Sequence, residues 1–219
     1  MQFVASSDNP ASALSVNIAS LQRPGGGELL CAIRFEVEEG KCLAVIGPNG
    51  SGKTSLLRAI SQELPLQKGN IQLLGRSVSA LSRQQRAKQI AVLAQNDTPD
   101  LRLALEDYVA LARVLAQMPS LVLLDEPTNH LDPSGRVELL SLVKNKGITV
   151  VAVLHDLSLI ESFADRVLLL SQGRMVLCDT PERVLVSENL YPVFGLTCFT
   201  VPHPDTGKAL RIFEVPGYA

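Results

Sequence analysis

The chain has 219 residues, of which 46% are hydrophobic and 19% are charged, and its formal net charge is -2 at pH 7. This length suits one globular domain with a buried core, and the composition excludes a disordered or fibrous chain. Because the charge is almost balanced, no basic field is available for phosphate backbones, and we expect no nucleic-acid partner.

The N-terminal part predicts a small antiparallel lobe over residues 12–39. Residues 1–20 contain no basic stretch followed by an apolar core, so we expect no secretion signal and a cytoplasmic protein. Residues 13–19 and 29–37 are strand-like, and the turn-forming residues 24–27 separate them.

A short buried strand over residues 42–46 is followed by a helix over residues 52–61, and the connection between them carries the strongest chemical signal. Residues 47–54 are Gly47, Pro48, Asn49, Gly50, Ser51, Gly52, Lys53 and Thr54, the G-x-x-x-x-G-K-[ST] pattern of a phosphate-binding loop. In such a loop backbone N–H groups and the helix dipole converge on phosphate oxygens. Lys53 supplies a positive charge to the β- and γ-phosphates, and Thr54 a hydroxyl to Mg²⁺. We therefore expect ATP and Mg²⁺ as cofactors.

Two further apolar segments, residues 71–74 and 89–93, flank a polar stretch at residues 82–88. The most apolar region, residues 101–124, is interrupted by four charged residues and contains no run of about 20 apolar residues, the length that a membrane span needs. Any membrane contact is therefore expected to pass through a partner.

Residues 121–124 and 148–154 are continuous apolar runs, which is typical of strands covered on both faces. With the strand–helix alternation they predict an α/β fold with a mainly parallel sheet. The first of them ends in Asp125 and Glu126. A carboxylate at this edge can hold Mg²⁺, which we assign to Asp125, and Glu126 is placed to orient or deprotonate an attacking water.

The C-terminal half contains two helix starts and a final pair of strands. Asp132 precedes Pro133, and Thr180 precedes Pro181, the signature of an N-cap followed by proline at the first helical position. Residues 195–216 predict two strands around a turn at 204–207. The cysteines are scattered singly, which predicts neither a zinc site nor a disulfide framework; they are Cys31, Cys42, Cys178 and Cys198.

These motifs together resemble the ATP-binding cassette (ABC) ATPases, a P-loop NTPase family. The resemblance rests on the phosphate loop, on Gln95 in Ala-Gln-Asn, on residues 125–132 (Asp-Glu-Pro-Thr-Asn-His-Leu-Asp) and on His155 in Leu-His-Asp. It implies that Gln95 senses Mg²⁺ and the attacking water, that His155 contacts the γ-phosphate, that Ser55 touches the α-phosphate, and that Asp132 lies in a loop crossing a dimer interface. The implied catalytic residues are thus Glu126, His155 and Gln95.

Within this family the loop, residues 125–132 and the segments 191–195 and 203–208 are similar to the importers of ferric siderophores, haem and cobalamin. The resemblance implies one nucleotide-binding domain over residues 1–219, with a core at 40–190 and a β tail at 191–219. It also implies a homodimer or heterodimer of cassettes, docked to integral-membrane permease subunits on the cytoplasmic face of the inner membrane.

One part of the family pattern is missing. Members of the family insert a helical subdomain between the phosphate loop and the strand that bears the acids, and it closes with a Leu-Ser-Gly-Gly-Gln type motif. Here no glycine lies between Gly75 and Gly135, and Ser-Gly-Gly occurs nowhere. Residues 106–117 resemble the entry of that subdomain joined to the helix that follows the motif. Since the motif of one subunit completes the partner's site, we expect nucleotide binding with impaired hydrolysis and doubtful permease docking.

Two functions remain open: the ATP-hydrolysing subunit of such an importer, or a non-catalytic or regulatory nucleotide-binding module derived from one. The family stacks the adenine on an aromatic residue ahead of the loop, whereas this chain offers Gln22, Arg23 and Pro24, so its base preference is also open. A nucleoside kinase fits less well, because Asp-Glu after a strand and a downstream histidine indicate water as the nucleophile.

Overall fold

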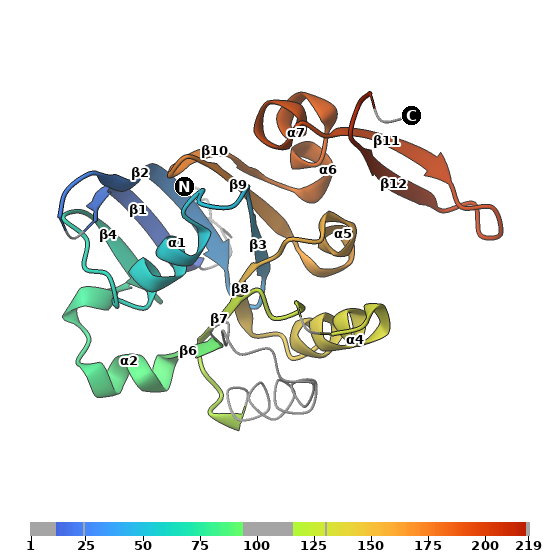
Figure 1. Ribbon diagram of the computed structural model, residues 1–219. Coiled ribbons are helices and arrows are strands. Elements are labelled where there is room, and N and C mark those ends of the chain that lie inside the picture. The colour runs from blue at the N-terminus through green and yellow to red at the C-terminus, as the bar shows by residue number, and fades with distance from the viewer. Residues whose placement is uncertain (1–11, 24, 94–115, 130, 218–219) are drawn as a thin grey trace, which may run out of the picture.

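The computed structural model describes residues 12–23, 25–93, 116–129 and 131–217 (Figure 1). Within them one large sheet has ten strands in the order β5-β4-β1-β2-β10-β9-β3-β8-β7-β6, and a second sheet pairs β11 with β12. The predicted α/β class and P-loop NTPase core, with helices on a mainly parallel sheet and an antiparallel lobe beside it, are confirmed.

The antiparallel lobe is formed by four strands: β1 (Ser12–Gln22), β2 (Glu28–Glu38), β4 (Lys68–Leu73) and β5 (Arg76–Ser77). Buried and exposed residues alternate along β2, since successive side chains of a strand point to opposite faces. The two strands expected here are present and longer than predicted. The residues between β1 and β2 contain the expected glycine turn, where the Arg23 carbonyl accepts from the Gly26 amide at 3.0 Å.

The parallel part contains β6 (Ile90–Leu93), β7 (Leu121–Asp125), β8 (Thr149–Val153), β3 (Cys42–Ile46) and β9 (Arg166–Ser171), with β10 (Arg174–Asp179) antiparallel to β9. Every residue of β3, β7 and β8 is buried, as expected for strands covered on both faces. Of these strands, β9 and β10 were not among the predicted elements.

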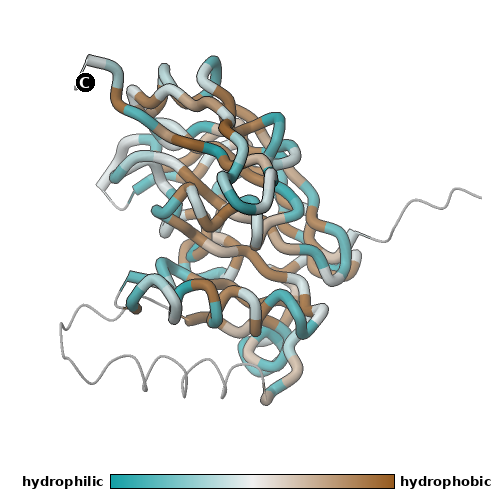
Figure 2. Tube along the Cα trace, turned by 90° about the vertical axis from the view of Figure 1, so that its right-hand side faces the viewer, coloured by the Kyte–Doolittle hydropathy of each residue, from teal (hydrophilic) through white to brown (hydrophobic). Residues whose placement is uncertain are grey.

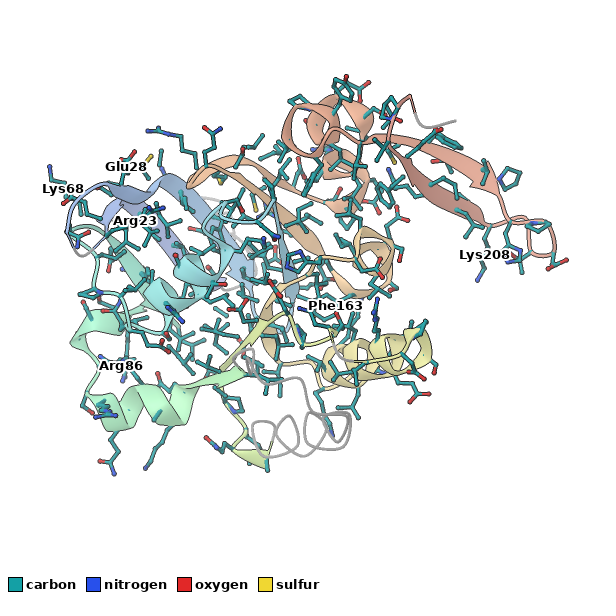
Figure 3. All side chains as sticks on the ribbon, in the orientation of Figure 1. Arg23, Glu28, Lys68, Arg86, Phe163 and Lys208 are labelled. Carbon is teal, nitrogen blue, oxygen red and sulfur yellow. The ribbon has the colours of Figure 1, made fainter. Side chains whose placement is uncertain are left out.

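Helices cover both faces of this part of the sheet. The first face carries α1 (Lys53–Ile60), whose Leu56 and Ile60 share one core with β2 and β3. The opposite face carries α4 (Pro133–Lys144), η2 (Leu157–Leu159), α5 (Ile160–Phe163), α6 (Pro181–Val184) and α7 (Ser187–Phe194), around a second core. Phe163, 1% exposed, belongs to that core and is labelled in Figure 3. Hydrophobic stretches gather in the middle of the molecule in Figure 2.

The polar stretch at residues 82–88 forms a helix, α2 (Arg83–Gln89), after the short η1 (Val78–Ala80). Its sequence signal is a capping box. The Ser82 hydroxyl accepts from the Gln85 amide at 3.2 Å, and the Gln85 side chain accepts from the Ser82 amide at 2.9 Å. No residue of α2 is buried, so its sequence has little apolar periodicity and we predicted no helix here; the capping box was the available signal.

The C-terminal hairpin of β11 (Thr197–Pro202) and β12 (Ala209–Glu214) projects away from the main sheet, with Lys208 near its far end (Figures 1 and 3). The tail boundary that we expected at residue 191 falls inside α7. Arg211 fixes the hairpin to the core: its Nε donates to Glu161 at 2.7 Å and its Nη1 to the carbonyl of Leu185, and its side chain is 15% exposed. Among the described residues, none of the helices is long and apolar enough to cross a bilayer.

Arg211→Ala is expected to destabilise the protein by about 2 kcal/mol, since it removes charge-assisted hydrogen bonds at a half-buried site. Urea unfolding measures the loss, and limited proteolysis should show faster cleavage within the hairpin. The matched control is Arg174→Ala, whose ion pair with Glu28 at 3.0 Å is exposed and is expected to contribute less than about 1 kcal/mol. Equal losses for the two variants would contradict this role for Arg211.

Candidate nucleotide-binding site

The predicted phosphate loop connects the carboxyl end of β3 to the amino end of α1. Gly52 is the N-cap of α1, no side chain caps this end, and the first turn contains no acidic residue. The first N–H groups of a helix have no partner within the helix, and the helix dipole makes this end positive. The end of α1 is therefore suited to bind an anion such as a phosphate group.

The loop lies close against the strand behind it. A Cβ added to Gly47 would lie 2.3 Å from the carbonyl oxygen of Leu170 in β9 and 2.5 Å from the hydroxyl oxygen of Ser51. A side chain at this position would push the loop away from the sheet, so the tight path depends on glycine. Ser51 is 2% exposed, and its hydroxyl has no hydrogen-bond partner among the described residues. Buried polar atoms of this kind are normally satisfied, which fits a loop completed by a ligand or water.

Lys53 extends back along the loop. Its Nζ donates to the carbonyl oxygens of Gly47 at 2.8 Å and Pro48 at 3.1 Å, and the residue is 6% exposed. Burial lowers the pKa of this ammonium group, while the nearby charges of Glu126 and Asp125 oppose the shift. A phosphate group in the loop would replace part of the lost hydration, so the residues present fit a polyphosphate.

The carboxyl end of β7 brings the two predicted acids to the same edge of the sheet. The Thr54 hydroxyl donates to Asp125 at 3.4 Å, and Asp125 is 8% exposed. Burial raises the pKa of the Asp125 carboxyl, the hydrogen bond from Thr54 lowers it, and the charge of Glu126 raises it again. A hydroxyl and a buried carboxylate side by side are hard oxygen ligands of the kind Mg²⁺ prefers.

Glu126 lies next to His155, the histidine that we expected to contact the γ-phosphate. Its Oε1 is hydrogen-bonded to His155 Nε2, and its Oε2 accepts from Asn129 Nδ2. His155 follows β8, which is the neighbour of β7, so adjacent strand ends bring together residues that are 29 positions apart. The Glu126 backbone has a φ of 53°, and its amide donates to Val153 of β8 at 3.2 Å, which anchors this turn to the sheet.

The other predicted residues have different positions. Asp132 caps α4, where its carboxylate accepts from the Gly135 amide at 2.8 Å; its role across a dimer interface stays a prediction. Ser55 lies in the first turn of α1 and is half-buried. Gln95 lies outside the described residues, so its assignment as a catalytic and metal-sensing residue also stays a prediction. Asn129, to which we gave no role, holds Glu126, and its position three residues after the acid was the available signal.

Asp125→Asn is expected to raise the midpoint of thermal unfolding at pH 7 in the absence of nucleotide and Mg²⁺. The pKa of Asp125 is higher in the folded than in the unfolded state, so its charged carboxylate destabilises the folded protein at neutral pH. This destabilisation is lost as the pH falls through the folded-state pKa toward the unfolded-state pKa. The gain should therefore shrink in acid. Thermal unfolding at several pH values measures it.

The control for this variant is expected to change the unfolding midpoint in the opposite direction. The Thr180 amide and then Arg183 lower the pKa of the partly exposed Asp179, so its contribution is present at neutral pH and lost in acid. Asp179→Asn should lower the midpoint at pH 7. A lower midpoint for both variants at pH 7 would contradict the buried charge assigned to Asp125.

The chain is similar to known proteins in sequence and in fold. Residues 30–108 match the family of ABC transporters. The chain is 34% identical to a hemin import ATP-binding protein of Pseudomonas entomophila, in a match that covers 86% of this chain and 95% of that protein. It is 33% identical to the protein of the same name from Streptomyces coelicolor, with coverages of 86% and 85%. The fold resembles cbiO1 of Clostridium perfringens, part of the ABC transporter complex cbiONQ, with a TM-score of 0.68, 22% identity and coverage of 83% and 94% of the two chains.

Proposed function

This chain belongs to the ATP-binding proteins of ABC transporters, and from that membership we propose that it is the nucleotide-binding subunit of an importer for hemin or a related metal complex. The names of the relatives support hemin more than the siderophores or cobalamin that the sequence motifs also allowed. By this proposal the protein is cytoplasmic and peripheral, and works as a dimer of cassettes attached to integral-membrane permease subunits.

The observation that carries the proposal is the convergence of the loop, the acids and the histidine at one edge of the sheet. Lys53 and the amino end of α1 would hold the phosphates, and Thr54 with Asp125 would hold Mg²⁺. Mg²⁺ would neutralise phosphate charge. Glu126 would orient or deprotonate the attacking water, and His155 with Asn129 would fix its carboxylate.

In the described state both oxygens of the Glu126 carboxylate have partners. Each oxygen of a carboxylate has a second lone pair, so an attacking water can still donate to Glu126. We propose that His155 turns from Glu126 toward another group when the nucleotide binds. A γ-phosphate oxygen is such a group, since a histidine N–H can donate to a phosphate oxygen as well as to a carboxylate oxygen. Contact between Glu126 and His155 would thus mark the resting site, and their separation the loaded one.

The length of the matched region supports a missing internal segment. The match to the Pseudomonas entomophila protein runs over 242 residues, yet 86% of this 219-residue chain is only about 188 residues. The difference suits a helical subdomain that the relative has and this chain lacks. We propose that the missing segment includes the Ser-Gly-Gly motif, so that hydrolysis and permease coupling are impaired.

The second candidate function is a non-catalytic or regulatory nucleotide-binding module, and the absence of Ser-Gly-Gly favours it. Co-purification with a tagged hemin permease from the same operon or from a relative separates the two. Retention with the permease that is weaker than that of an intact cassette, but is increased by Mg-ATP, is the result expected of an import subunit with impaired coupling. Failure to bind, when an intact cassette binds the same permease, would overturn the importer proposal and leave the module.

A further inference from the structure

The back of the phosphate loop is in contact with a turn far away in the sequence. The amide of Gly173 donates to the carbonyl oxygen of Ser51 at 2.9 Å, and the carbonyl oxygen of Gly173 accepts from the amide of Cys31 at 2.9 Å. One residue thus uses both of its backbone polar groups to join the loop to β2.

The contact is also a close steric fit. A Cβ added to Gly173 would lie 2.4 Å from the carbonyl oxygen of Leu29, and one added to Gly52 would lie 2.6 Å from Cδ2 of Leu30 and 3.6 Å from the Cα of Gly173. Gly52, the N-cap of α1, therefore packs directly on β2 and on the turn that contains Gly173. A side chain at position 173 would require the backbone of β2 or of the turn to move, whereas one at position 52 would first displace the side chain of Leu30.

Gly173 lies where the two halves of the large sheet meet. The antiparallel lobe joins the rest of the sheet through the pairing of β2 with β10, and the register of that pairing is the single match of Arg174 with Cys31. Figure 1 shows β2 beside β10 at this junction. The side chains of Arg174 and Glu28 also pair here at 3.0 Å, but both are exposed, and such pairs contribute little.

We propose that Gly173 is a positioning residue for the phosphate loop. Its two backbone hydrogen bonds connect Ser51 to β2 and so hold the loop in the shape that binds phosphate. This inference rests on the proposed nucleotide binding. The alternative is a purely structural role, in which Gly173 only completes the turn of the β9–β10 hairpin. A two-residue hairpin loop with a type I′ turn needs a positive φ at both positions, and Gln172 and Gly173 have φ values of 49° and 76°.

The chain contains a matched control for that alternative. The hairpin of β4 and β5 also has a two-residue loop, in which Leu74 and Gly75 have φ values of 49° and 74°. A Cβ added to Gly75 meets no atom within 4 Å. Alanine at position 75 therefore introduces the same backbone strain as alanine at 173, without the contact to Leu29 and without the link to the phosphate loop.

The experiment compares Gly173→Ala with Gly75→Ala by calorimetric titration with Mg-ATP and by thermal unfolding. Both variants are expected to melt earlier than the wild type, because alanine is strained at these φ values. Gly173→Ala alone should bind Mg-ATP at least tenfold more weakly. Equal affinities of the two variants would overturn the inference but leave the proposed nucleotide binding intact. Failure of the wild type itself to bind Mg-ATP would overturn both.

A second measurement needs no variant, and so holds even if Gly173→Ala does not fold. Amide hydrogen exchange of the wild type, followed by NMR, should slow at least tenfold at Gly173 when Mg-ATP is added, because an ordered loop keeps the Ser51 carbonyl in place. The amide of Leu74, which donates to Ala13 at 2.7 Å in the control hairpin, should not change. An unchanged rate at Gly173 in protein saturated with Mg-ATP would overturn the inference.

Discussion

Lys53→Ala is expected to weaken Mg-ATP binding at least about 100-fold. The ammonium group is the one charged donor of the phosphate loop, and each charge-assisted hydrogen bond is worth about 1.5–3 kcal/mol. Loss of two such bonds to phosphate oxygens corresponds to about 100-fold or more in affinity. Titration calorimetry of the wild type and the variant measures the difference.

The same variant should keep or raise its stability without nucleotide. Burial disfavours the charged form of Lys53 more than the charges of Glu126 and Asp125 favour it, so its removal relieves a cost that a bound phosphate would offset. Lys41→Ala is the control. That lysine pairs with Asp165 at 3.4 Å on an exposed surface and should leave binding unchanged. An unaltered Mg-ATP affinity of folded Lys53→Ala would contradict the assignment of residues 47–54 as a phosphate-binding loop.

The purified chain alone is expected to hydrolyse ATP about 100- to 1,000-fold more slowly than an intact hemin-import cassette. Removal of one preformed donor to a developing anion typically costs that much in rate, and the missing segment would supply at least one. The measurement is a steady-state phosphate-release assay at saturating Mg-ATP. Turnover of the chain alone at the rate of the intact cassette would contradict both the missing segment's role and the impaired hydrolysis.

A mixing experiment shows whether the site itself is competent. The chain is combined with an intact cassette whose own loop lysine is replaced by alanine. Any activity must then come from Lys53, Asp125 and Glu126 of this chain together with the Leu-Ser-Gly-Gly-Gln type motif of the intact cassette. Activity that appears in the mixture and is lost with Glu126→Gln indicates a usable half-site. A mixture as inactive as its parts, although the two chains form a dimer, favours the non-catalytic module.

Much of this site was predictable because its chemistry is encoded locally. The phosphate loop needs glycines, a lysine and a threonine at fixed spacing, and a buried strand and a helix flank it in the sequence as in the structure. The acids after β7 and the capped start of α4 are likewise defined within a few residues. Local rules of this kind need no knowledge of distant contacts.

Other features could not be predicted locally. We predicted a polar stretch and no helix at residues 82–88, because α2 has no buried face and therefore no apolar periodicity. The strands β9 and β10 were not among the predicted elements, although β9 has an apolar centre, because a short apolar run is ambiguous between strand and helix when considered alone. Strand β10 has a mixed pattern, and its place is set by its neighbours β9 and β2.

The sequence by itself determined the chemical groups: a phosphate loop, two acids after a strand, a histidine after another, and the absence of Ser-Gly-Gly. Only the tertiary structure decided that Glu126 lies against His155 and Asn129, and that Gly173 joins the loop to β2. The physical reason is that strand order in a parallel sheet is set by long-range packing. Residues far apart in the chain become neighbours only when their strands pair.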